Sequence, residues 1–197
     1  MQATHKTKVD VRKMTVIGIL SAISIMLSMI PGVGYIPIGP TKATIMHIPV
    51  IIGSVIEGPI VGASVGFVFG LSSMFNAWLT PTVTSFAFMN PLISVVPRVL
   101  MGVLSYYVFK LVIKISKKVY LSGLITGAIG SILNTAGVLG MIYLLYGERY
   151  AVAMDQSASA AGKLILTLIA TNGVPEAIVG AIVVASVTVA LKKVIRK

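Results

Sequence analysis

The stretch TIMHIPVIIGSVIEGPIVGASVGFVFGLSSMFNAW, residues 44–78, decides the fold because two apolar runs in it are separated by only three residues. The separator, Glu57-Gly58-Pro59, is a strong turn signal and is too short to join anything but a helical hairpin. The second run, Ile60–Trp78, is long enough to cross a bilayer, which takes about 20 residues. The first, Thr44–Ile56, is too short to span the bilayer comfortably alone, so we expect it to pack against neighbouring helices.

Glycines in the second run recur at every fourth position, at Gly62, Gly66 and Gly70. This spacing places all three on one face of a helix, where the missing side chains permit another helix to approach closely. The sequence therefore predicts tight helix–helix packing along this face.

Outside this hairpin the chain contains four more long apolar runs, and its composition matches them. Of its 197 residues 56% are hydrophobic and 11% charged, and the mean hydropathy is +0.99. No soluble domain of this size buries so much apolar surface. We therefore expect one all-α domain over residues 1–197, a bundle of six transmembrane helices in the cell membrane. The expected helices are Met14–Ile30, Thr44–Ile56, Ile60–Trp78, Ala87–Phe109, Leu121–Tyr146 and Leu164–Leu191.

The distribution of Lys and Arg gives the orientation. The N-terminus, the connection between the fourth and fifth helices, and the C-terminus carry four basic residues each. The opposite side has only Lys42, Arg149 and Lys163. Because cytoplasmic loops are enriched in Lys and Arg, twelve against three predicts that both termini are cytoplasmic. The same pattern explains the net charge of +11 without any role for nucleic acid.

Several functional classes have no support in the sequence. The chain has no GxxxxGK[ST] phosphate loop, no HExxH pair and no Ser–His–acid set, and it contains two His and no Cys. We therefore expect no catalytic residues, no metal site and no cofactor, and no use of ATP by this chain itself.

Two ionisable side chains lie within the expected membrane helices. A charge at the centre of a membrane helix costs about 2.5–3.5 kcal/mol, so such residues call for a reason. At about 1.5 Å per residue, Arg98 lies about 18 Å from the cytoplasmic charges of its helix. Glu176 and Asn134 each lie about 24 Å from theirs, and Asn90 and Asn172 lie further out. Helices four, five and six thus place polar groups in the outer half of the membrane.

Two interpretations of these groups stay open. In one, Arg98 and Glu176 neutralise each other, and Asn134 ties helices together. In the other, the polar groups line a cavity that opens outward and holds a small hydrophilic ligand. Arg suits the second role, since its planar fork grips a carboxylate through two parallel hydrogen bonds.

Four other residues also have two interpretations each. His47 is a ligand contact or a packing histidine. Trp78 belongs to an interfacial aromatic belt or to a lid over a ligand. Gly18 and Ala22 form a small-xxx-small pair, which serves packing within the chain or docking to another subunit.

The order of segments along the chain resembles the substrate-binding S components of energy-coupling factor transporters. The resemblance rests on the small-residue first helix, on IPIGPTKATIMHIPVIIGSVIEGPIVGASVGFVFGLSS and on NPLISVVPRVLMG, and it covers nearly the whole chain. The stretches HIPVIIGSVIEGP, TSFAF and VPRVLMG look most like the pantothenate-type branch.

The resemblance implies a function and partners. An S component binds a vitamin outside and associates with a transmembrane coupling subunit and two cytoplasmic ATPases. Gly18 and Ala22 would then dock the coupling subunit, although the family more often has Ala at the first position. The substrate-binding set would comprise Arg98, Asn134, Glu176, Asn172, His47, Asn90 and Trp78. Alternative ligands are riboflavin, folate, pyridoxine and hydroxymethylpyrimidine. Alternative functions are a stand-alone facilitator or channel, and a membrane-embedded enzyme or assembly factor.

Overall fold

The structure, a computed structural model, describes residues 10–30, 34–38 and 41–195. Its helices, in chain order, are α1 (Val11–Met29), α2 (Ile48–Glu57), α3 (Pro59–Leu79), α4 (Ser85–Phe88), α5 (Pro91–Ser94), α6 (Val96–Ser116), α7 (Val119–Ala153), the 3-10 helix η1 (Ala158–Ala160) and α8 (Ala161–Ile195). Between α1 and α2 lies a short antiparallel hairpin, β1 (Tyr35–Ile38) and β2 (Thr41–Thr44). Pro31 and Gly32, the expected end of the first helix, lie outside the described residues, as do Lys6, Lys8, Arg196 and Lys197 of the basic clusters.

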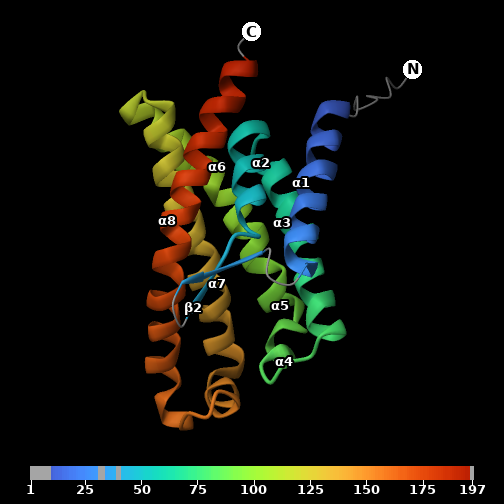
Figure 1. Cartoon of the computed structure of the whole chain (residues 1–197), viewed down its shortest axis with the longest axis vertical. Coiled ribbons are helices and arrows are strands. Elements are labelled where there is room, and N and C mark those ends of the chain that lie inside the picture. Colours follow the sequence, from blue (N-terminus) through green and yellow to red (C-terminus); the bar gives the residue numbers. More distant parts are fainter. Residues whose placement is uncertain (1–9, 31–33, 39–40, 196–197) are drawn as a thin grey trace, which may run out of the picture.

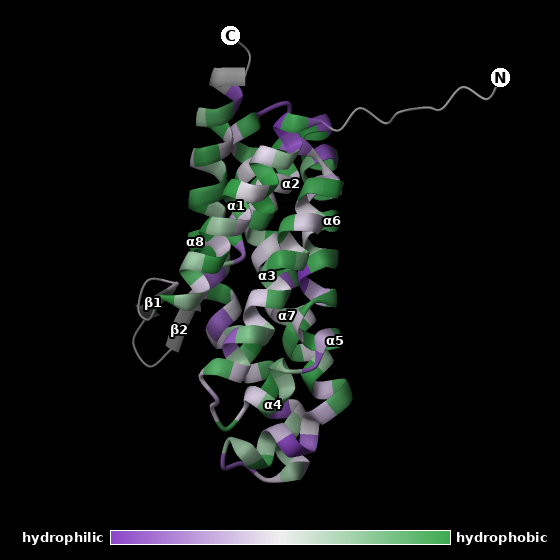
Figure 2. Cartoon of the chain, turned by 90° about the vertical axis from the view of Figure 1, so that its right-hand side faces the viewer, coloured by the Kyte–Doolittle hydropathy of each residue, from purple (hydrophilic) through white to green (hydrophobic). Residues whose placement is uncertain are grey.

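The chain forms an all-α bundle of membrane type. Within the described residues, five helical segments are long and apolar enough to cross a membrane, and α2 is a shorter apolar helix. The start of α1, the turn between α6 and α7 and the last turns of α8 lie at one end of the bundle, and α4 and η1 lie at the other (Figure 1). Apolar residues cover most of its length, and hydrophilic residues gather near the ends (Figure 2).

The short helix α2 forms the centre of the bundle. All of its residues from Ile48 to Val55 are buried, and it packs against α1, α3, α6, α7 and α8. It ends at Gly58, whose φ of +102° is open to glycine but strained for other residues. Pro59 then begins α3 at once, so the predicted helical hairpin at Glu57-Gly58-Pro59 is confirmed.

The glycine face of α3 packs as its spacing predicts. A Cβ on Gly66 would lie 2.5 Å from the carbonyl oxygen of Arg98, and one on Gly70 would lie 2.6 Å from that of Ser94. A Cβ on Gly62 would meet the backbone of Gly102 in the same way. The close approach predicted for this face is therefore confirmed, and its partners are α5 and α6.

The expected fourth and fifth helices are more irregular than their apolar runs suggest. The expected fourth helix is divided into α4, α5 and α6, with breaks before Pro91 and Pro97, since proline lacks the N–H that continues a helix. Helix α7 does not end at Tyr146, the expected boundary. It kinks there (φ −142°, ψ 19°) and continues to Ala153, into the segment between the expected fifth and sixth helices.

Helix α1 reverses the arrangement of a soluble amphipathic helix. The residues that it buries are Ser21, Ser24 and Ser28, whereas Ile19 and Met26 are more than half exposed. An apolar outer surface suits a helix whose solvent is lipid. Two of the inward hydroxyls bond across the bundle, from Ser24 to the carbonyl of Met46 and between Ser28 and Ser72.

Candidate substrate-binding site

The length of α2 sets the depth of the site. Ten residues of helix rise about 15 Å, so α2 covers only half of a hydrocarbon core of about 30 Å. His47, directly before α2, therefore lies near the middle of the bundle. The β1–β2 hairpin leads into this point and crosses the bundle at mid-height (Figure 1). The connection between α1 and α2 thus brings backbone and side chains to membrane depth.

Glu176 on α8 holds this connection in place. Its Oε1 accepts hydrogen bonds from the backbone N–H of Thr44 (2.9 Å) and from the Thr44 hydroxyl (2.7 Å). Its Oε2 accepts a short hydrogen bond from the hydroxyl of Thr135 on α7. The side chain is only 3% exposed. Three neutral donors thus stabilise the carboxylate and attach β2 to both α7 and α8.

The position of Arg98 follows from the proline before it. Pro97 has no N–H to donate to the carbonyl of Ile93, four residues back. The Nη1 of Arg98 donates to that carbonyl instead (2.6 Å), and the guanidinium lies 5.5 Å from the ring centre of Phe69. The residue is 5% exposed, yet within the described residues no carboxylate lies within 4.0 Å of it and its Nε has no partner.

The two buried charges do not form an ion pair. Arg98 and Glu176 are both buried, but among the described residues no salt bridge within 4.0 Å joins them. The hydrogen bonds of Glu176 all come from Thr44 and Thr135. The described residues therefore do not show the direct ion pair between Arg98 and Glu176 that the first interpretation expects.

His47 and Asn134 are also incompletely bonded. The Nε2 of His47 lies 2.8 Å from the hydroxyl of Ser131, and that hydroxyl donates its own proton to the carbonyl of Gly127. In a neutral imidazole Nε2 is then the donor, and Nδ1 is an acceptor without a partner. The Oδ1 of Asn134 is likewise buried without a donor.

Three of the predicted site residues carry a buried polar atom that has no hydrogen-bond partner among the described residues. Among the described residues six buried side-chain atoms lack a hydrogen bond, and three of them belong to His47, Arg98 and Asn134. Buried polar atoms in native proteins almost always have a partner. One donor on Arg98 and one acceptor each on Asn134 and His47 are thus left without a partner among the described residues.

The other three predicted ligand contacts, Asn172, Asn90 and Trp78, lie on separate elements. Asn172 is half-buried on α8, one turn from Glu176. Asn90 begins α5, where its Oδ1 accepts from the N–H of Leu92 and its Nδ2 donates to the hydroxyl of Tyr146 (3.1 Å). Trp78 is 68% exposed and lines an apolar hollow of about 160 Å³ with Met74 and Phe75. This setting favours the aromatic-belt interpretation for Trp78.

Sequence reasoning missed the hydroxyls that organise the site. Ser131 and Thr135 flank Asn134 on one face of α7, so the spacing of polar residues around Asn134 could have revealed them. Nothing in the sequence pairs Thr44 with Glu176, because that contact depends on the path of the hairpin. Phe69 reads as an ordinary apolar residue of α3.

The small-residue face of α1 points away from the rest of the chain. Gly18 and Ala22 are exposed, and a Cβ added to Gly18 would have no other atom within 4 Å. Helix α1 contacts α2 and α3 through a different face, which carries the three buried serines. Packing within the chain therefore does not account for this pair.

Residues 12–191 match the sequence model of a family described as "ECF transporter, substrate-specific component". The chain belongs to this family. A "Pantothenic acid transporter PanT" of Lactococcus lactis subsp. cremoris is 34% identical over 168 residues, covering 78% of this chain and 80% of that protein. A "Pantothenate transporter PanT" of Leuconostoc mesenteroides is 31% identical over 125 residues, 60% of this chain and 61% of the relative. The chain is thus an S component, a multi-pass protein of the cell membrane, and the pantothenate-type resemblance is confirmed.

Proposed function

We propose that this S component is the high-affinity pantothenate-binding subunit of an energy-coupling factor importer. It captures the vitamin outside and delivers it inward with a transmembrane coupling subunit and two cytoplasmic ATPases. The similarity to pantothenate transporters supports the substrate, and the family supports the partners. The observation that carries the proposal is a buried Arg98 with no carboxylate beside it among the described residues.

Pantothenate has groups that would pair with the unpartnered atoms of Arg98, Asn134 and His47. Its carboxylate would bind the guanidinium of Arg98, where a bidentate hydrogen bond supplies both the counter-charge and a partner for Nε. Its hydroxyl and amide groups would face Asn134 and His47, whose acceptor atoms are unpartnered. Glu176 would not touch the carboxylate. It would position the hairpin that forms one wall of the site.

The test compares pantothenate with pantothenol, in which a primary alcohol replaces the carboxylate. Both ligands are titrated into the purified protein and into Arg98→Gln by calorimetry. Hydrogen bonds to charged groups contribute about 1.5–3 kcal/mol, so pantothenol should bind the parent about 10- to 150-fold more weakly than pantothenate. Arg98→Gln should weaken pantothenate by a similar factor and pantothenol hardly at all.

The two titrations distinguish an error in the assigned carboxylate site from an error in the assigned substrate. Equal losses for both ligands in Arg98→Gln would place the carboxylate elsewhere in the protein. No measurable binding of pantothenate to the parent would reject the substrate, and titration of riboflavin, folate, pyridoxine and hydroxymethylpyrimidine would follow. Asn134→Leu is the matched variant for the other end of the ligand, and it should weaken both ligands equally.

A further inference from the structure

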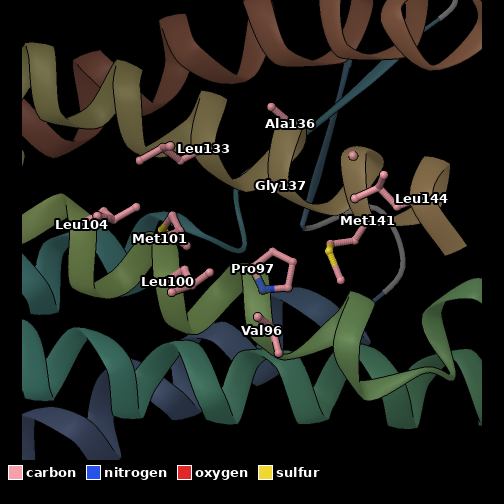
Figure 3. Close-up of a pocket in the computed structure, with 11 residues that line it drawn as sticks. Val96, Pro97, Leu100, Met101, Leu104, Leu133, Ala136, Gly137, Met141 and Leu144 are labelled. Atoms are coloured by element: carbon pink, nitrogen blue, oxygen red, sulfur yellow. The ribbon is translucent and has the colours of Figure 1, made fainter. Parts of the chain in front are cut away.

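An apolar groove runs between α6 and α7 on the outside of the bundle. It has a volume of about 340 Å³, and its lining includes Val96, Pro97, Leu100, Gly137, Gly140 and Leu144. Figure 3 shows the lining residues of α6 on one side and those of α7, among them Ala136 and Gly137, on the other. The groove is open at Gly140, where an added Cβ would meet nothing within 4 Å. At Gly137 the two helices are in close contact, since an added Cβ would lie 3.1 Å from the Cβ of Pro97.

The groove spans about one leaflet. Along α7 the groove extends from Leu133 to Leu144, a rise of about 17 Å at about 1.5 Å per residue, and it runs toward the end of the bundle where α4 and η1 lie. A hydrocarbon core is about 30 Å thick, so this length matches the thickness of one leaflet. A single extended acyl chain has the matching shape.

A polar hollow continues the groove at that interface. Leu144 lines both, and the second hollow, about 710 Å³, lies at the end of the α7–α8 hairpin. Glu148, Arg149 and Ser159 line it and are exposed. The guanidinium of Arg149 lies over the ring of Phe86 at 4.1 Å, which fixes its position. One anionic and one cationic side chain thus stand side by side where a lipid head group would lie.

We propose that the groove and this hollow together bind one outer-leaflet phospholipid with a zwitterionic head group. Its acyl chain lies between α6 and α7, its phosphate meets Arg149 and its ammonium meets Glu148. The exposed face of Gly18 and Ala22 is on α1, which contacts α2 and α3 rather than α6 or α7. A partner docked on α1 therefore leaves the groove open to the bilayer. This assignment does not depend on the identity of the vitamin.

The test uses the full chain in nanodiscs that contain phosphatidylethanolamine with a photoactivatable group on one acyl chain. Crosslinks concentrated on peptides with Leu100 and Gly140 support the proposal, and crosslinks spread evenly over all lipid-facing helices overturn it. Retention of the same lipid through detergent purification is then measured by native mass spectrometry. Gly140→Leu places a large side chain in the groove at a position where a Cβ meets no other atom within 4 Å, and retention should fall about tenfold because the acyl-chain contacts are lost.

Matched variants separate the groove from general effects. Gly140→Ala changes the same position but leaves the groove open, so it should retain the lipid as the parent does. Equal loss in Gly140→Ala and Gly140→Leu would overturn the proposal. Arg149→Gln should lower retention of phosphatidylethanolamine, whereas equal retention in the two proteins would remove the head-group assignment. A crosslink from the groove to the coupling subunit in the assembled transporter would identify a protein occupant and overturn the lipid.

Discussion

Arg98 combines three features that rarely occur together: deep burial, a positive charge and no carboxylate beside it among the described residues. Its neighbour Pro97 frees the carbonyl of Ile93, which gives the guanidinium one fixed hydrogen bond and leaves its other donors oriented but incompletely used. The depth of this residue was predictable from hydropathy. Its lack of an ion pair was not, because Thr44 and Thr135 satisfy Glu176 from segments far apart in the sequence.

The first prediction separates a ligand site from a structural pair. Since Glu176 keeps its three hydrogen bonds without Arg98, Arg98→Gln should remain folded and lose pantothenate affinity by about 10- to 150-fold. Arg98→Lys should also lose affinity, because a point charge does not reproduce the two-pronged grip. Thermal unfolding and calorimetry on the same preparations measure both properties.

The control is the double variant Arg98→Gln with Glu176→Gln. On the structural-pair interpretation, removing both charges restores stability and leaves binding within about twofold of the parent. We expect the opposite. Glu176→Gln should itself destabilise the protein, because Gln has one acceptor oxygen where the carboxylate uses two, and binding should stay lost in the double variant.

At the scale of elements, proline and local polarity explain where sequence and structure differ. Helix α2 begins at Ile48 rather than Thr44 because β2 uses Thr44, and Pro49 suits the first turn of a helix. Helix α7 runs past Tyr146 because the polar residues that follow lie beyond the membrane, where a polar helix costs nothing in desolvation. The spacing of small residues, in contrast, predicted the packing of α3 directly.

The second prediction concerns the open face of α1. Gly18→Leu or Ala22→Leu places bulk on an exposed face that none of the described residues covers, so the isolated protein should bind its ligand normally. Uptake by the complete transporter should be lost, because a small-xxx-small face allows the close helix approach that a leucine blocks. Radiolabelled pantothenate uptake and binding are measured in parallel.

Gly18→Ala provides the matched control and should retain uptake, because an alanine keeps the face small. Loss of ligand binding by the isolated Gly18→Leu protein would show that this face packs internally. Unimpaired uptake by both leucine variants would place the coupling subunit on another helix.

For the whole molecule, the structure brings the expected cytoplasmic segments to one end of the bundle. The start of α1 and the α2–α3 turn even form an ion pair there, between Arg12 and Glu57 (2.7 Å). The count of twelve basic residues against three still supplies the only argument for which end faces inward.

The third prediction tests six spans with both termini inside. The chain has no cysteine, so Ser157→Cys introduces a single thiol, at an exposed position beside η1. An impermeant maleimide should label it from outside intact cells, and a reporter fused after Lys197 should be cytoplasmic. Labelling only after the membrane is opened would reverse the orientation.

The short central helix has an electrical consequence. A vitamin carboxylate held beside His47 and Arg98 would lie about halfway across the membrane, since only the ten residues of α2 separate that level from the expected cytoplasmic end. Moving one charge through the whole field takes about 2.3 kcal/mol per 100 mV, so half the path takes about 1.1 kcal/mol. For an anion entering a cell that is negative inside, affinity should then weaken about sevenfold per 100 mV. Binding to right-side-out vesicles clamped by potassium and valinomycin measures this directly, and an affinity that does not change with voltage would place the bound carboxylate near the outer surface.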